Sequence, residues 1–170
     1  MLNYRREREI IGGDEHVMVI LSNQGAELRY FSVRSAGLHA VPGIASHAWA
    51  LASAREFGLS LDDYRAQSLT AEMVQEADAI FAMDYQNEVE LLSAYPAARQ
   101  KIFMLGAYVA DGHRHLEIAD PYYASPEQTR NCYQVLERCV HELAADVLQN
   151  LKEKAADDPT RVPCNANHES

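Results

Sequence analysis

The sequence predicts an α/β domain with three layers, in which a doubly wound, mostly parallel sheet of four strands is flanked by helices. Two observations support this class. Short apolar runs alternate along the chain with segments whose apolar residues recur at helical spacing, which is typical of a sheet covered by helices. The 170 residues also suffice for one hydrophobic core, and they contain no internal repeat or linker.

The strands are expected where short apolar runs are bounded by turn residues. These runs cover residues 16–21, 28–34, 79–83 and 101–105. Residues 22–26, in the turn between the first two runs, cannot supply the crossover of about a dozen residues that adjacent parallel strands need. The N-terminal crossover is therefore altered or absent. Either the first run pairs antiparallel, or it is not the first strand of the sheet. Loss of a crossover also predicts exposed side chains at Phe81 and Phe103.

Capping residues mark the expected helices. A helical pattern over residues 44–57 ends before Gly58, Thr70 caps a short helix through Ala77, and Asp84 caps a helix that reaches about Ala94.

The last helix has the clearest start, since Ser125 and Gln128 form a capping box around Pro126. Its apolar stripe comprises Cys132, Val135, Leu136, Cys139, Val140, Leu143, Val147, Leu148 and Leu151.

Composition restricts the classes of function. The formal net charge of −10 argues against binding to nucleic acid or an anionic membrane, because both need clustered cations. No apolar run approaches a membrane span, and no apolar segment of a signal peptide follows the charged start of the chain. The odd count of three cysteines is unlike a disulfide framework. We expect a cytoplasmic protein with an irregular lead-in over 1–15, one domain over 16–153 and a disordered tail over 154–170.

A proline-fixed loop precedes the last helix. Pro121 disfavours helical geometry at Asp120, and two phenols, Tyr122 and Tyr123, follow directly. A carboxylate held beside aromatic walls can serve as a general acid. The same residues would also suit a simple turn with two half-buried tyrosines, so the loop alone leaves both interpretations open.

Several short segments, taken in order, resemble the low-molecular-weight protein-tyrosine-phosphatase family, whose fold arsenate reductases share. The similarity covers about residues 31–149. The matching segments are Ser35-Ala36-Gly37, Tyr64-Arg65-Ala66-Gln67-Ser68-Leu69-Thr70, Glu76-Ala77-Asp78-Ala79-Ile80, Ala82-Met83-Asp84 with Asn87, Lys101-Ile102, Leu105-Gly106 and Asp120-Pro121-Tyr122-Tyr123.

The resemblance implies hydrolysis of phosphotyrosine monoesters through a cysteinyl-phosphate intermediate, without a cofactor. It identifies Asp120 as the general acid and places Tyr122 and Tyr123 beside the substrate ring. The expected partner is a phosphotyrosine protein or a small phosphomonoester, provided that the site is complete. Ala124 stands where family members usually carry glycine. The sequence gives no indication of the oligomeric state.

One departure from the family affects the mechanism. The family's nucleophile lies in a Cys-x-x-x-x-x-Arg-Ser loop directly after the first strand, and no such loop follows residues 16–21. The chain is therefore expected to be inactive as written. It is either a pseudo-phosphatase with a replaced N-terminal segment, or a fragment or faulty reading frame. A non-catalytic interaction module is the alternative function, and an arsenate reductase-type relative is a third possibility.

Other candidate residues favour structural roles. Cys132 and Cys139 share a helix face, but their α-carbons would be about 10 Å apart, too far for a disulfide, so buried core thiols are expected. A metal site at Asp111, His113 and His115 is disfavoured against a solvated turn. His39 and His47 show no partner signal. Trp49 is expected to pack on the sheet or to line the rim of the pocket.

Overall fold

The computed structural model describes residues 18–23, 31–109 and 116–156. Four strands form one sheet in the order β2-β1-β3-β4, an order found in doubly wound α/β folds. The strands are β1 (Met18–Asn23), β2 (Phe31–Ala36), β3 (Ala79–Ala82) and β4 (Ile102–Met104). The expected four-stranded sheet is confirmed, with its second strand shifted toward the C-terminus.

Strand β1 runs against its neighbours. It pairs antiparallel with β2, from Met18 opposite Ala36 to Asn23 opposite Phe31, and antiparallel with β3, where Ile20 lies opposite Ile80. Strands β3 and β4 pair in parallel. Strands β2, β3 and β4 therefore share one direction, as the prediction of a mostly parallel sheet requires. Of the two alternatives for the first run, the antiparallel hairpin is the one observed.

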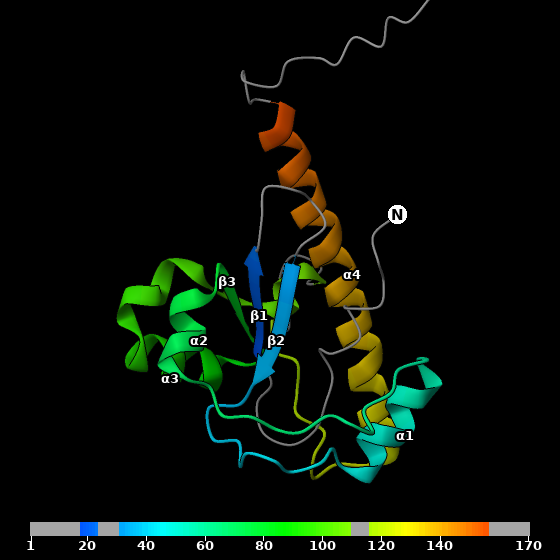
Figure 1. Ribbon diagram of the computed structural model, residues 1–170. Coiled ribbons are helices and arrows are strands. Elements are labelled where there is room, and N and C mark those ends of the chain that lie inside the picture. The colour runs from blue at the N-terminus through cyan, green and yellow to red at the C-terminus, as the bar shows by residue number, and fades with distance from the viewer. Residues whose placement is uncertain (1–17, 24–30, 110–115, 157–170) are drawn as a thin grey trace, which may run out of the picture.

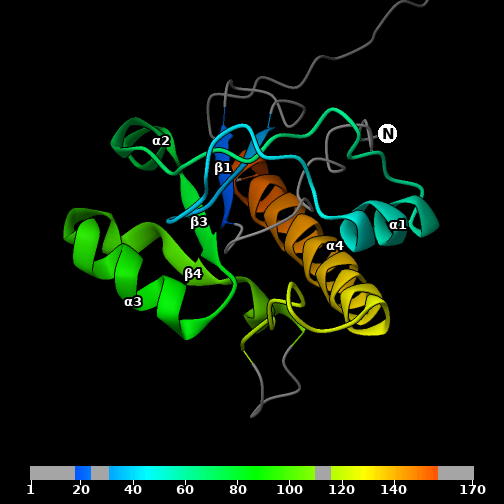
Figure 2. The same ribbon diagram turned by 90° about the horizontal axis from the view of Figure 1, so that it is seen from below.

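Helices cover both faces of this sheet, which gives the three expected layers (Figure 1). On one side lie α2 (Ala71–Glu76) and α3 (Tyr85–Ala94), and on the other lies the long α4 (Pro126–Ala156), with α1 (Ala48–Glu56) beside it. Figure 2 shows the same division from below. Two short 3₁₀ helices, η2 (Pro96–Lys101) and η3 (Leu105–Tyr108), flank β4.

Side-chain alternation along β3 distributes its residues between two of the hydrophobic clusters of the core. Ile80 and Ala82 pack with residues of α2 and α3, whereas Phe81 and Met83 pack with the apolar stripe of α4. Phe81 is 2% exposed and Phe103 is 46% exposed. The expectation of exposure was therefore wrong for Phe81, which α4 covers, and correct for Phe103 on the edge strand.

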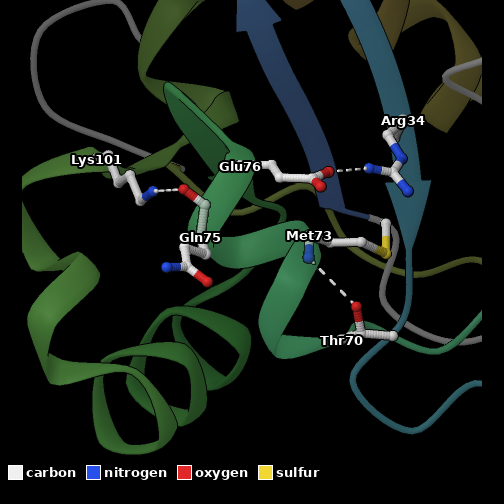
Figure 3. A network of polar contacts seen from close by, with 6 residues as sticks. All are labelled: Arg34, Thr70, Met73, Gln75, Glu76 and Lys101. Carbon is white, nitrogen blue, oxygen red and sulfur yellow. Dashed lines mark hydrogen bonds and ion pairs between the residues drawn. The ribbon is translucent and has the colours of Figure 1, made fainter.

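Polar contacts hold α2 against the sheet from two sides (Figure 3). Arg34 of β2 forms an ion pair with Glu76. Lys101 Nζ donates to the carbonyl oxygens of Gln75 at 3.2 Å and Ala77 at 2.6 Å. A cation beside the last carbonyls of a helix is favourable, because these groups carry the negative end of the helix dipole.

The three predicted N-terminal caps are present. Thr70 accepts from the amide of Met73, Asp84 accepts from that of Asn87, and Ser125 accepts from that of Gln128.

The first helix begins at Ala48, not at Ile44 as expected. Ala45 is instead paired with Arg65 in an isolated antiparallel bridge, which removes the preceding turn from the helix. Gly58, at φ +70°, follows the helix end as predicted.

Candidate functional site

The acid loop, residues 116–125, leads into the start of α4. Asp120 is exposed, and its Oδ1 accepts a hydrogen bond from the Tyr122 amide at 2.9 Å. The amide of Ala124 donates to the Pro121 carbonyl at 3.0 Å. The carboxylate is thus held by its own loop, in the non-helical backbone that the following proline favours.

Two hydrogen bonds fix this loop to the carboxyl end of β3. The Ile118 amide donates to the Met83 carbonyl at 2.7 Å, and Glu117 Oε1 accepts from the Tyr85 amide at 3.1 Å. The Glu117 carboxylate therefore lies at the positive end of α3, where an anion is favourable. Sequence reasoning did not assign this role to Glu117, because the signal is a contact between residues 32 positions apart.

Gly106 of η3 allows the acid loop to approach it closely. A β-carbon at this position would lie 2.1 Å from the carbonyl oxygen of Leu116. Any larger residue would push the loop away from the sheet, so this close approach explains the glycine in the Leu105-Gly106 segment.

Four rings gather where the acid loop meets the start of α1, and we call His47, Trp49, Tyr122 and Tyr123 the aromatic cluster. The ring centroids of Tyr122 and Tyr123 are 4.5 Å apart, those of His47 and Tyr122 are 5.5 Å apart, and those of His47 and Trp49 are 4.9 Å apart. All three pairs meet edge to face, which is a favourable aromatic geometry. Tyr123 is 94% exposed.

His47 has a partner that the sequence did not suggest. Its Nδ1 accepts a hydrogen bond from the Trp49 amide at 3.3 Å, so the imidazole caps α1. This contact assigns the remaining proton of the neutral ring to Nε2. The sequence showed no partner signal for His47 because imidazole is an uncommon cap, and the capping contact is a structural role of the kind that was favoured. Trp49 was expected on the sheet or at the rim of a pocket, and the structure places its ring against His47.

His39 also has a partner that the sequence did not suggest. Its Nε2 lies 2.6 Å from Glu90 Oε2 of α3, and this contact is an ion pair whenever the imidazole is protonated. Both side chains lie at the surface, where such a pair contributes little to stability.

Cys132 and Cys139 occupy the core side of α4, as predicted. Cys139 is fully buried, and both thiols pack in the cluster beneath α4. Burial raises the pKa of the Cys132 thiol to about 12, and the negative charge of Asp120 adds to that rise. Burial likewise raises the pKa of Cys139 to about 11. A nucleophilic cysteine needs the opposite shift.

A Cys-x-x-x-x-x-Arg string does occur between Cys132 and Arg138, but it lies inside α4. Within a helix the backbone amides bond to carbonyls four residues earlier, so they cannot encircle an anion. Cys139 also stands where the family motif carries serine. The string therefore has the spacing of the family motif but lacks the loop whose backbone amides bind phosphate.

Within the described ranges, no three histidine, cysteine or acidic side chains are grouped as metal ligands would be. Asp111, His113, His115 and Cys164 lie outside those ranges. Among the described helices, none is long and apolar enough to cross a membrane.

The family model for low molecular weight phosphotyrosine protein phosphatases matches residues 15–156. The chain belongs to this family. The resemblance carried by the ordered segments is thus confirmed, and so is the fold that it implies.

Relatives within the family come from several bacteria. The low molecular weight protein-tyrosine-phosphatase Etp of Escherichia coli K12 is 32% identical over 66% of this chain and 73% of its own length. The crystal structure of the Erwinia amylovora tyrosine phosphatase AmsI is 34% identical over 63% of this chain and 68% of its own, with a TM-score of 0.58. The tyrosine phosphatase Wzb of Escherichia coli K30, in complex with sulphate, is 28% identical over 66% and 76%, with a TM-score of 0.60.

Proposed function

We propose that this chain is a pseudo-phosphatase: its Asp120-Pro121-Tyr122-Tyr123 loop resembles the acid loop of a phosphotyrosine phosphatase, but it does not hydrolyse phosphomonoesters through a cysteinyl phosphate. One observation carries the proposal. No cysteine precedes Cys132 in the 170 residues, and the thiols of Cys132 and Cys139 pack in the hydrophobic cluster beneath α4.

The chemistry of the family's reaction explains why a buried thiol does not suffice. The nucleophile is a thiolate, which a ring of backbone amides and one arginine stabilise while they hold the phosphate oxygens. At pH 7, a thiol whose pKa is about 12 is ionised in only about one molecule in 10⁵. Asp120 would be the general acid by resemblance, but without an attacking thiolate it has no leaving group to protonate.

The rest of the proposal concerns the bounds of the domain and its location. We assign residues 16–153 to a single phosphatase-like domain, in agreement with the family match over 15–156. We also assign Tyr122 and Tyr123 to the ligand-facing side of the site and place the protein in the cytoplasm. An arsenate reductase-type reaction has less support, because it would need two reactive thiols and both described cysteines are packed in the core.

Hydrolysis of p-nitrophenyl phosphate and of a phosphotyrosine peptide tests this proposal. We expect no release of phosphate above the buffer rate, and no difference between the wild type, Asp120→Ala and Cys132→Ser. Asp63→Ala serves as the matched control, because Asp63 is an exposed aspartate away from the acid loop. Turnover that persists in Asp63→Ala and disappears in Asp120→Ala would show that the site is catalytic.

A further inference from the structure

The aromatic cluster and Asp120 present an open surface with one kind of charge. Tyr123 is almost fully exposed and Asp120 lies at the surface. Within the acid loop, residues 116–125, there are two carboxylates, Glu117 and Asp120, and no lysine or arginine. The first turn of α1 adds Trp49 and no charge.

The neighbouring cation does not neutralise this surface. Arg130, the first basic residue after the acid loop, forms an ion pair with Glu56 at 2.7 Å. Over the described ranges, no lysine or arginine forms an ion pair with Asp120. The Asp120 charge is also felt inside the protein, since it helps to raise the pKa of Cys132.

Such a surface favours a cation over an anion. A phosphate dianion would meet like charge from Asp120 without a described arginine to offset it. A cation would instead be attracted both by the electron-rich faces of the aromatic rings and by the Asp120 carboxylate. The overall charge of −10 acts in the same direction, because it raises the local concentration of cationic partners.

We propose that the aromatic cluster and Asp120 bind an arginine side chain presented by a peptide segment of a partner protein. The proposal rests on the proposed function, because it requires that the same site does not hold a phosphate group. The guanidinium stacks on the exposed ring of Tyr123 and donates to Asp120. Since Oδ1 already accepts from the Tyr122 amide, Oδ2 is the oxygen that it meets.

Arginine fits this surface better than lysine. Its guanidinium is planar and weakly hydrated, so it can lie flat on a ring while its N–H groups reach a carboxylate. An ammonium is a compact and strongly hydrated charge, which loses more solvation in the same position. We therefore expect a lysine peptide to bind more weakly than the matching arginine peptide.

The only tryptophan of the chain lies in the cluster and reports binding. The fluorescence of Trp49 is followed while the full chain is titrated with a short peptide containing one arginine. The control peptide carries citrulline, which keeps the shape and loses the charge. We expect a saturable change with the arginine peptide and an affinity lower by about tenfold with citrulline. Inorganic phosphate is expected to leave the emission unchanged.

Two variants locate the site. Asp120→Asn and Tyr123→Ala are each expected to lower the affinity for the arginine peptide by about threefold to tenfold. Asp63→Asn is the matched control for the charge, since Asp63 is an exposed aspartate outside the acid loop; it should bind as the wild type does. Amide signals of Asp120 and of residues 122–124 in ¹H–¹⁵N spectra provide a second readout that does not depend on Trp49.

Equal binding of the citrulline peptide would overturn the proposal, as would a phosphate-induced change in Trp49 emission. The absence of a saturable change in both readouts would also overturn it. These failures differ from a failure of the proposed function. Hydrolysis of p-nitrophenyl phosphate would contradict the pseudo-phosphatase assignment, whereas missing arginine binding in an inactive protein would contradict this inference alone.

Discussion

Strands β1 and β3 are neighbours at the centre of the sheet, yet they lead to different structures. Strand β3 ends at Ala82, and Asp84 then starts α3 at the same edge of the sheet. Strand β1 ends at Asn23, and the next described element is β2, which returns antiparallel beside it. One strand is followed by a helix and the other by its partner in a hairpin.

This difference determines which residues reach the functional edge. In α/β sheets, ligands bind beyond the carboxyl ends of the parallel strands. Strand β3 delivers Asp84 there, and the acid loop joins it through the Met83 carbonyl. Because β1 runs in the opposite direction, its residue Asn23 lies at the other edge, opposite Phe31. A reversed strand can fill the sheet without contributing its carboxyl end to the site.

A proline in β1 tests its central position and should have the largest effect. Ile20 is paired on both sides, with Arg34 and Ile80. Since proline cannot donate to a ladder, Ile20→Pro is expected to cost about 3 kcal/mol or more. Urea unfolding followed by circular dichroism measures the loss. Ile20→Ala, which keeps the amide, is the control; equal losses in both variants would argue against a doubly paired strand.

An added methyl group at Gly106 tests the position of the acid loop, which joins the carboxyl end of β3. The new β-carbon would overlap the Leu116 carbonyl, so Gly106→Ala is expected to lower the free energy of unfolding by about 2 kcal/mol. It should also displace the acid loop, which amide signals of residues 118–122 would report. Ala107→Gly, at an exposed neighbouring position, controls for a change of residue in η3. Unchanged stability in Gly106→Ala would mean that Leu116 does not lie against Gly106.

The buried thiols predict a smaller, pH-dependent effect. Folding raises the pKa of Cys132 from 9.0 to about 12, so the unfolded chain loses this proton at a lower pH than the folded protein does. Stability should therefore fall as the pH rises from 9 to 12. Tyr108 and Tyr133, whose pKa values burial also raises, contribute in the same range.

Comparison with Cys132→Ala isolates the contribution of Cys132 to the decline of stability with pH. Between pH 9 and 12, the urea midpoint should decline less steeply in the variant than in the wild type. The two slopes of the free energy of unfolding against pH should differ by at most the contribution of one proton. Identical slopes would show that the Cys132 thiol titrates alike in the folded and unfolded chains. That result would also reopen the thiol as a candidate nucleophile.

Local signals explain why most elements were predictable from sequence. Thr70, Asp84 and Ser125 each accept from the backbone amide three residues later. A capping side chain acts within its own turn, so its effect can be inferred without the tertiary structure. The apolar stripe of α4 is equally local, because helical spacing alone puts Leu136 and Leu143 on one face.

The errors arose from contacts distant in sequence. The bridge between Ala45 and Arg65 shortens α1, and no local pattern announces it. The place of His47 in the aromatic cluster was not predicted, because it depends on Tyr122, which lies 75 positions later although the two ring centroids are 5.5 Å apart. Phe81 was expected to be exposed because the helix of the missing crossover would have covered it. In the structure, α4 covers Phe81 instead. The direction of β1 was left open for the same reason, since strand pairing is not local.

The attachment of the acid loop has a practical consequence for protein engineering. The loop is held by Met83, by the first turn of α3 and by its close approach to Gly106. All of these contacts come from residues after position 80. A designer could therefore exchange the segment before β2 for a catalytic loop taken from an active relative, and the acid would already be in place to receive it.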